Sequence, residues 1–280
     1  MSGLGKVYTG PDIALWRRLA LRISRRLVIG IFFAGVGSVL AAQLAGWHPP
    51  KGLPTALLVL FALLCLGAVW ATYERQRLVR EAPLPHFLKR KLRESYPHLS
   101  QRDAELVERG LRQFFLACLR SRGKFVAMPS RVVDSMWHEF ILHTAAYRDW
   151  CALALGRFVD HVPAQALRRQ ASQARVNDGL RRAWYWACRD ESIKPREPSR
   201  LPLLFALDAK LGIANGFHYQ PDCRRLAGDG STGGVYCGES FSDGSYSGDA
   251  DHFGGSEASS SEGSGDASDA GGGDGCGGGD

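Results

Sequence analysis

The sequence lacks several patterns that would point to a particular chemistry. It has no CxxC pair, and its seven cysteines are odd in number: Cys65, Cys118, Cys151, Cys188, Cys223, Cys237 and Cys276. A disulfide framework is therefore not expected, and reduced thiols in a cytosolic setting fit better. No cofactor motif is present, so we expect no cofactor, and no alternating apolar pattern indicates strands.

Positive charge is missing from the end of the chain. No Lys or Arg follows Arg225, while eleven acids lie between Asp229 and Asp280. The first 228 residues therefore carry a net charge of +18, and the remainder carries −11. Residues 229–280 are rich in Gly, Ser and Asp and have too little apolar surface to offset the entropy lost on ordering. We predict a basic body followed by a disordered, acidic tail.

Charge is also missing from two long stretches near the N-terminus. Residues 27–47 and 54–73 contain no charged side chain. At a rise of 1.5 Å per residue, each helix would be roughly 30 Å long, enough to cross the hydrocarbon core of a bilayer. Only residues 48–53 join them, and Pro49 and Pro50 suit a tight turn. The sequence predicts a two-helix transmembrane hairpin.

The basic residues around the hairpin predict its orientation. Residues 1–26 contain six cations and residues 74–98 contain seven, whereas the turn at 48–53 contains only Lys51. The positive-inside bias places both flanks in the cytoplasm, with a short external turn between the spans. We expect a multi-pass protein of the inner (cytoplasmic) membrane with both termini cytoplasmic. A cleaved signal peptide is the alternative, but the apolar run is too long and a second run follows at once.

Residues 74–98 are interpreted as a basic juxtamembrane connector. Phe87, Leu88 and Leu92 could touch the apolar boundary while the neighbouring cations meet anionic lipid head groups. The simpler alternative is a stop-transfer charge cluster.

Residues 99–228 are predicted to form a small, mainly α-helical cytoplasmic domain. Ser100 could cap a helix that ends at Arg120, with Asp103 as the reciprocal acid. Ser130 could cap a second helix running to about Leu155. Further helices are expected from about residue 164 to 188 and at 203–211.

The second of these helices carries the candidate polar site. Asp134 and His138 are four residues apart, so the carboxylate could fix the tautomer of the imidazole. His138 and His143 are five apart, about 140° around a helix, which excludes the two-histidine helix motif of zinc proteases. Metal binding through Glu139, His143 and His161, catalysis, and a purely structural hydrogen bond are the open alternatives.

The stretch from Val133 to Pro163 resembles a known family. The shared positions are Val133-Asp-x-x-Trp-His138, His143-Thr-x-x-Tyr147, Cys151 and Phe158-x-x-His161-x-Pro163. They resemble the glycine-rich domain-containing protein-like family, a domain of unknown function. The later segment 203–212 and the glycine-rich end resemble its bacterial, membrane-anchored type. The resemblance implies a helical domain and a glycine-rich tail, and brings no agreed role for Asp134, Trp137, His138 or Tyr147. Plant relatives are discussed as RNA-associated, but this chain has no aromatic RNP-type motif.

Four arginines recur every seven residues, at Arg168, Arg175, Arg182 and Arg189. Seven residues make nearly two helical turns, so these cations would share one face. Either this basic surface binds a phosphate-bearing partner or it is a solvated face.

These patterns favour a membrane-tethered, non-enzymatic interaction module with an unidentified protein partner. A metal-dependent or histidine-based enzyme centred on Asp134 and His138 is one alternative. An RNA- or anionic-lipid-binding protein is another, with nucleic acid the less expected ligand. The roles of Cys223, Cys237 and Cys276 stay open.

Overall fold

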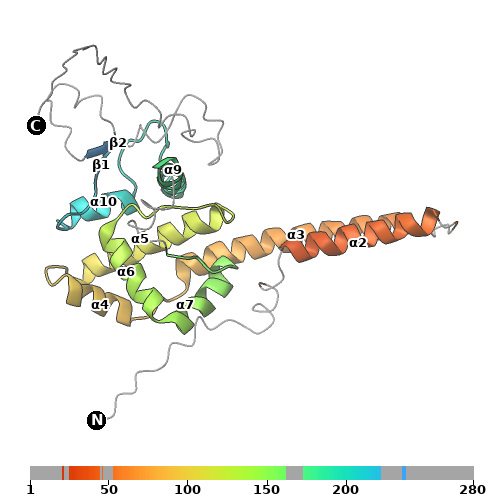
Figure 1. The fold of residues 1–280 in the computed structure, drawn as a ribbon, viewed down its shortest axis with the longest axis horizontal. Coiled ribbons are helices and arrows are strands. Elements are labelled where there is room, and N and C mark those ends of the chain that lie inside the picture. Colours follow the sequence, from red (N-terminus) through yellow and green to blue (C-terminus); the bar gives the residue numbers. More distant parts are fainter. Residues whose placement is uncertain are drawn as a thin grey trace, which may run out of the picture.

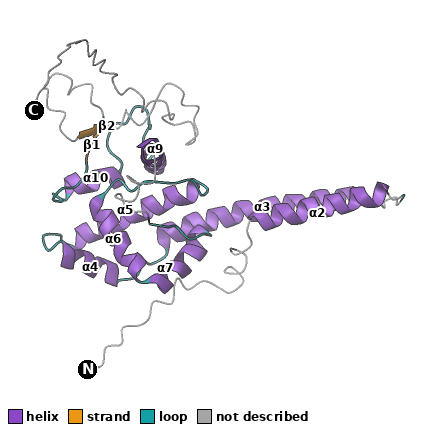
Figure 2. Ribbon diagram, in the orientation of Figure 1, coloured by secondary structure: helices purple, strands orange, loops and turns teal. Residues whose placement is uncertain are grey.

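The computed structural model describes residues 21, 25–44, 46, 53–161, 173–221 and 235–237 of the chain. Within them the protein is mainly helical, which confirms the mainly α part of the expected fold class. The helices are α2 (Arg25–Leu44), α3 (Leu53–Glu81), α4 (Phe87–Ser95), α5 (Gln101–Arg120), α6 (Arg131–Leu142), α7 (Thr144–Trp150), the π-helix η1 (Cys151–Leu155), α9 (Gln173–Asp190) and α10 (Leu203–Lys210). The strands are β1 (His218–Gln220) and β2 (Val235–Cys237), and Figures 1 and 2 show the helices gathered around α5 with one long arm projecting from them.

The projecting arm consists of α2 and the first two thirds of α3, which lie side by side (Figure 1). The rings of Phe32 and Phe61 meet across the pair at 4.4 Å between centroids. Among the described helices, one, counted from Thr55 to Glu81, is long and apolar enough to cross a membrane, and its apolar window is not buried anywhere in the molecule. The apolar part of α2 is shorter, from Phe32 to Ala42.

The last two turns of α3 belong to the folded domain. Val79 is completely buried, and α4 follows after a turn that contains Pro83 and Pro85. Leu88 and Leu92 of α4 are each 1% exposed and pack against α5 and α6. The expectation that these leucines touch a lipid boundary is therefore wrong. The apolar face of α4 is covered by protein, because an amphipathic helix beside α5 completes the core.

α5 lies at the centre of the domain and starts as the sequence predicts. The Ser100 hydroxyl accepts a hydrogen bond from the Asp103 N–H, and the Asp103 carboxyl accepts one from the Ser100 N–H, which completes a capping box. Most of its apolar residues are buried, including Phe114 and Phe115. The chain then turns at Gly123, where φ is +96°.

The predicted helix from Ser130 to about Leu155 is in fact three elements. Ser130 caps α6 as expected, through its hydroxyl and the Val133 N–H. The break falls at His143, whose N–H donates to the Phe140 carbonyl while its ring Nδ1 lies 3.0 Å from the Glu139 carbonyl oxygen. In a continuous helix that Glu139 oxygen would accept the His143 N–H. The side chain has replaced the backbone donor, and the chain restarts as α7 and η1.

The C-terminal part of the domain is built from α9, α10 and a two-stranded sheet. α9 begins at Gln173, and the predicted start near residue 164 lies outside the described residues. β1 and β2 pair in parallel, with His218 opposite Val235 and Gln220 opposite Cys237. Residues 235–237, assigned to the disordered tail, are therefore paired with the domain, while the rest of the predicted tail lies outside the described residues.

Candidate functional site

The polar face of α6 forms a compact cluster with the segment that follows η1. Asp134 Oδ1 lies 3.0 Å from His161 Nε2, so the partner of this carboxyl group is His161 and not His138. The His161 side chain is 12% exposed and that of Asp134 is 41% exposed. The expected pairing within α6 is thus replaced by a contact between residues 27 positions apart.

His138 lies beside this pair at the surface. Its ring is 4.9 Å from that of His161, edge to face, and the residue is exposed. The indole of Trp137 lies 4.7 Å from the His161 ring, centroid to centroid. His161 is therefore held between an aromatic ring, a carboxyl group and a second, solvent-facing imidazole.

Tyr147 fixes the loop that carries His161. Trp137 Nε1 donates to the Tyr147 hydroxyl at 3.1 Å, and that hydroxyl donates to the Val159 carbonyl at 2.6 Å. Burial raises the pKa of Tyr147 far above its ordinary value, so the hydroxyl stays protonated and remains a donor. These two motif residues position His161 from inside the core.

His143 does not join the cluster. Its ring stacks on Phe87 of α4 at 3.8 Å between centroids, and its Nδ1 is engaged by the Glu139 carbonyl. The proposed metal set of Glu139, His143 and His161 is therefore not assembled. Across the described ranges, no group of three His, Cys, Asp or Glu residues comes together as a metal site would require.

The buried thiols offer little reactivity. Burial raises the pKa of Cys118 to about 12 and that of Cys151 to about 11, so both stay protonated at neutral pH. The pKa of Cys188 is raised for the same reason. These cysteines act as small apolar core residues.

Of the four arginines predicted to share a face of the helix expected from about residue 164 to 188, Arg182 and Arg189 have described side chains, and they differ in their surroundings. Arg182 is only 17% exposed, and its Nη1 donates to the Phe125 carbonyl at 2.9 Å. Arg189 is exposed. Arg168 lies outside the described residues, and Arg175 lies in α9 with its side chain not described. Arg182 thus joins α9 to the segment between α5 and α6, a structural use that the seven-residue spacing could not reveal.

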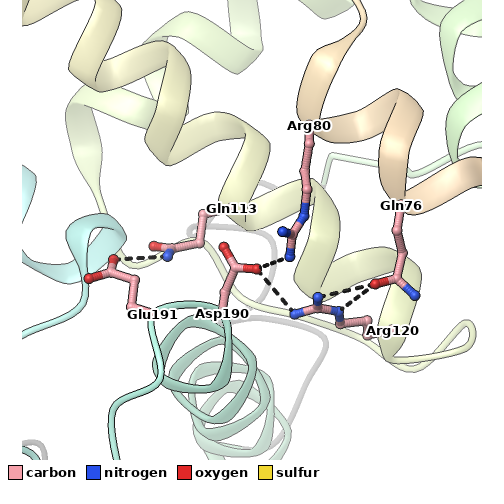
Figure 3. Close-up of polar contacts among 6 residues, drawn as sticks. All are labelled: Gln76, Arg80, Gln113, Arg120, Asp190 and Glu191. Atoms are coloured by element: carbon pink, nitrogen blue, oxygen red, sulfur yellow. Dashed lines mark hydrogen bonds and ion pairs between the residues drawn. The ribbon is translucent and has the colours of Figure 1, made fainter. Parts of the chain in front are cut away.

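A second polar cluster, which the sequence did not predict, joins α3, α5 and α9 (Figure 3). The Asp190 carboxylate accepts from Arg80 at 2.5 Å and lies 3.4 Å from Arg120 Nη1. Arg120 also donates to the Gln76 side chain at 3.1 Å. The end of the long arm is therefore attached to the domain by charged side chains as well as by the buried Val79.

Glu191, the next residue, extends this cluster toward α10. It accepts from the Gln113 amide at 3.0 Å, from the Leu203 N–H at 2.6 Å and from Arg200. Burial by itself would raise the pKa of Glu191, but these hydrogen bonds and the Arg200 charge lower it overall. Gln113 in turn accepts from the Leu204 N–H at 2.9 Å, so both side chains cap the start of α10.

Asp208 of α10 is a further residue that the sequence analysis missed. It is 1% exposed, and its two oxygens accept from the Ser130 hydroxyl at 2.7 Å and from the N–H groups of Arg131, Val132 and Phe217 at 2.8, 3.2 and 2.9 Å. Asp208 thereby caps α6, the helix that carries Asp134 and His138. A single acid inside an otherwise apolar helix was the available signal.

Chemically, the Asp134–His161 pair is an imidazole oriented by a carboxyl group, the arrangement that acid–base catalysis uses. The same arrangement also serves to hold a loop on a helix. The burial of His161 and the bonds of Tyr147 favour the holding role, whereas the exposure of His138 leaves one imidazole accessible.

Comparison with known proteins gives one match. A family model described as UCP032817-like covers residues 74–241. It begins where α3 enters the domain and ends after β2, so it includes α4 and the parallel strand pair. No curated protein and no solved structure matches the chain.

Proposed function

The chain belongs to the UCP032817-like family, an uncharacterised domain of unknown function, and from this premise we propose that it is a membrane-tethered, non-enzymatic interaction module. The helical domain lies at the cytoplasmic face of the inner membrane. The bacterial membrane-anchored type and the glycine-rich tail of the family resemblance form part of this proposal.

One observation carries the proposal: α3 is a single helix with two different surroundings. Its apolar part is unburied over the whole window, and side chains such as Leu58 and Leu63 are 70% and 60% exposed. Its last two turns are built into the core around Val79. A large exposed apolar surface is costly in water and favourable in lipid.

α2 completes the proposed hairpin. It packs on α3 through Phe32, and no charged residue follows Arg26 in it. Two antiparallel spans would bring residues 1–26 and the domain to the same side, the side with the basic flanks. The multi-pass topology with both termini cytoplasmic follows from this arrangement.

Alkaline carbonate extraction of membranes that contain the full chain tests the tether. We expect the wild-type chain to stay in the membrane pellet. Leu63→Arg should reduce the retained fraction, because an arginine near the middle of a span costs about 2.5–3.5 kcal/mol. Leu142→Arg is the matched control, since Leu142 is a leucine on the domain surface with a similar exposure of 64%.

Complete release of the wild-type chain by carbonate would refute the tether. A reporter fused after residue 280 tests the orientation, and activity of that reporter only in the periplasm would refute the cytoplasmic placement. For the interaction role, capture of acidic protein partners by the full chain should weaken as salt rises. An absence of capture at low ionic strength would contradict that role.

A histidine-based enzyme is the second candidate, favoured by the Asp134–His161 pair and the exposed His138. A panel of ester and phosphoester substrates tests it with purified chain. A hydrolysis rate lost in both His161→Gln and Asp134→Asn, and kept in His143→Gln, would support it. Equal rates in all four proteins would remove it.

A further inference from the structure

The contacts between α3 and α5 fix the direction in which α5 points. Arg112 Nη1 donates to the Val79 carbonyl at 2.8 Å, whereas Arg120, eight residues later, donates to Gln76. The C-terminal end of α5 therefore lies closer to the apolar part of α3 than its N-terminal end does. The loop that follows α5 must lie near the level of Tyr73, where the uncharged stretch ends. In Figure 1 this loop turns on the side of the domain from which the arm projects.

That loop is basic and exposed to solvent. Arg122, Gly123 and Lys124 are all exposed. Arg122 and Gly123 have φ values of +49° and +96°, and no atom lies within 4 Å of the place where a Gly123 Cβ would stand. The left-handed conformation of both residues reverses the chain sharply and leaves its two cations at the tip.

A second loop, after η1, reaches the same level. A Cβ on Gly156 would lie 2.5 Å from Arg75 Cζ, so this loop packs directly on the side chain at the start of the charged part of α3. Its next residue, Arg157, donates to the Cys118 carbonyl at 3.3 Å near the end of α5. Arg157 therefore lies beside the α5 loop.

We propose that Arg122, Lys124 and Arg157 form a basic collar around the base of the arm that binds the phosphates of anionic phospholipids in the leaflet from which α3 emerges. This inference rests on the proposed membrane tether. The two loops lie where the apolar surface of α3 gives way to charge, which is the depth of lipid head groups. Each cation near an anionic leaflet strengthens binding about fivefold.

The basic helix α4 occupies the opposite end of α5. Lys89 of α4 pairs with Glu108 at 3.0 Å, and about 18 Å of helix separates Glu108 from Arg120. α4 also follows the last turns of α3, so Glu81 lies about 12 Å beyond Tyr73. The cations of α4, which the sequence assigned to the membrane surface, therefore belong to the other end of α5. They supply a matched control of equal charge.

The test uses full-length chain purified in mild detergent with equal amounts of phosphatidylglycerol and phosphatidylcholine. The phospholipid that stays bound after washing is quantified by mass spectrometry. We expect phosphatidylglycerol to be enriched several-fold over phosphatidylcholine on the wild-type chain and on R90Q/K91Q. On R122Q/K124Q the several-fold enrichment should be lost and the ratio should return to about 1, since two cations are removed. Circular dichroism establishes that the variants are folded.

Two results would overturn the collar. One is undiminished enrichment on R122Q/K124Q. The other is an equal fall on both double variants, which would reflect net charge and not the location of the cations. The tether is judged separately, by carbonate extraction of the same proteins. A chain that stays in the membrane without a preference for phosphatidylglycerol refutes the collar alone, and a chain stripped by carbonate refutes the tether as well.

Discussion

Two aspartates, Asp208 and Asp190, each join several elements of the domain, but in opposite surroundings. Asp208 is 1% exposed and binds the Ser130 hydroxyl and three backbone N–H groups. Asp190 has a side chain that is 17% exposed and binds the flexible side chains of Arg80 and Arg120. The first junction is closed to solvent and fixes α6. The second lies at a rim, where salt and water can weaken the attachment of α3 and α9.

Substitution of the buried aspartate should have the largest effect. We expect Asp208→Ala to lower the free energy of unfolding by about 4 kcal/mol, because it leaves four donors without their acceptor and uncaps α6. Chemical denaturation followed by circular dichroism measures the change. Asp160→Ala, at an exposed position, is the control and should change stability by less than about 0.5 kcal/mol. A loss under about 1 kcal/mol for Asp208→Ala would contradict the conclusion that the buried junction is the stronger of the two.

The rim aspartate should matter less and should respond to salt. Asp190→Ala is expected to cost about 1–2 kcal/mol at low ionic strength, since its partners are only partly shielded from water. The difference between wild type and variant should shrink as salt rises, whereas that of Asp208→Ala should not. Denaturation at two salt concentrations compares them. A salt-independent loss at Asp190 would place it with the buried junction.

The smallest effect is expected from pH at Glu191. Because the folded state lowers the pKa of this carboxyl, its contribution to stability is present above the unfolded pKa of about 4.3 and is lost as pH falls through the folded value. Stability should therefore decline from about pH 5 downward. Glu191→Gln should flatten that decline, which denaturation midpoints measured between pH 3 and 7 would reveal. An identical pH profile in the variant would assign the decline to other carboxyl groups.

Local signals in the sequence predicted local structure well. Ser100 with Asp103, and Ser130, start α5 and α6 as expected, because a cap depends on residues within one turn. These features need no knowledge of what packs nearby.

Most of the errors involve partners that are distant in sequence. Asp134 could bond to His138 one turn away, and only the folded chain brings His161 closer to it. His143 could continue a helix, yet the position of Phe87 of α4 gives its ring a stacking partner where α6 ends. Leu88 and Leu92 would show the same apolar spacing in the sequence whether lipid or protein covers them. Spacing cannot choose between such alternatives, because the choice depends on tertiary contacts.

The continuity of α3 has a mechanical consequence. Between its apolar window and the buried Val79 the helix has no break, and the Arg80 and Arg120 contacts hold its end at more than one point. If the window lies in a bilayer, a change in the tilt of the span, for example in a thinner bilayer, reorients the whole domain by the angle through which the span tilts. Local membrane geometry would then set which surface of the domain faces the cell interior, without any hinge.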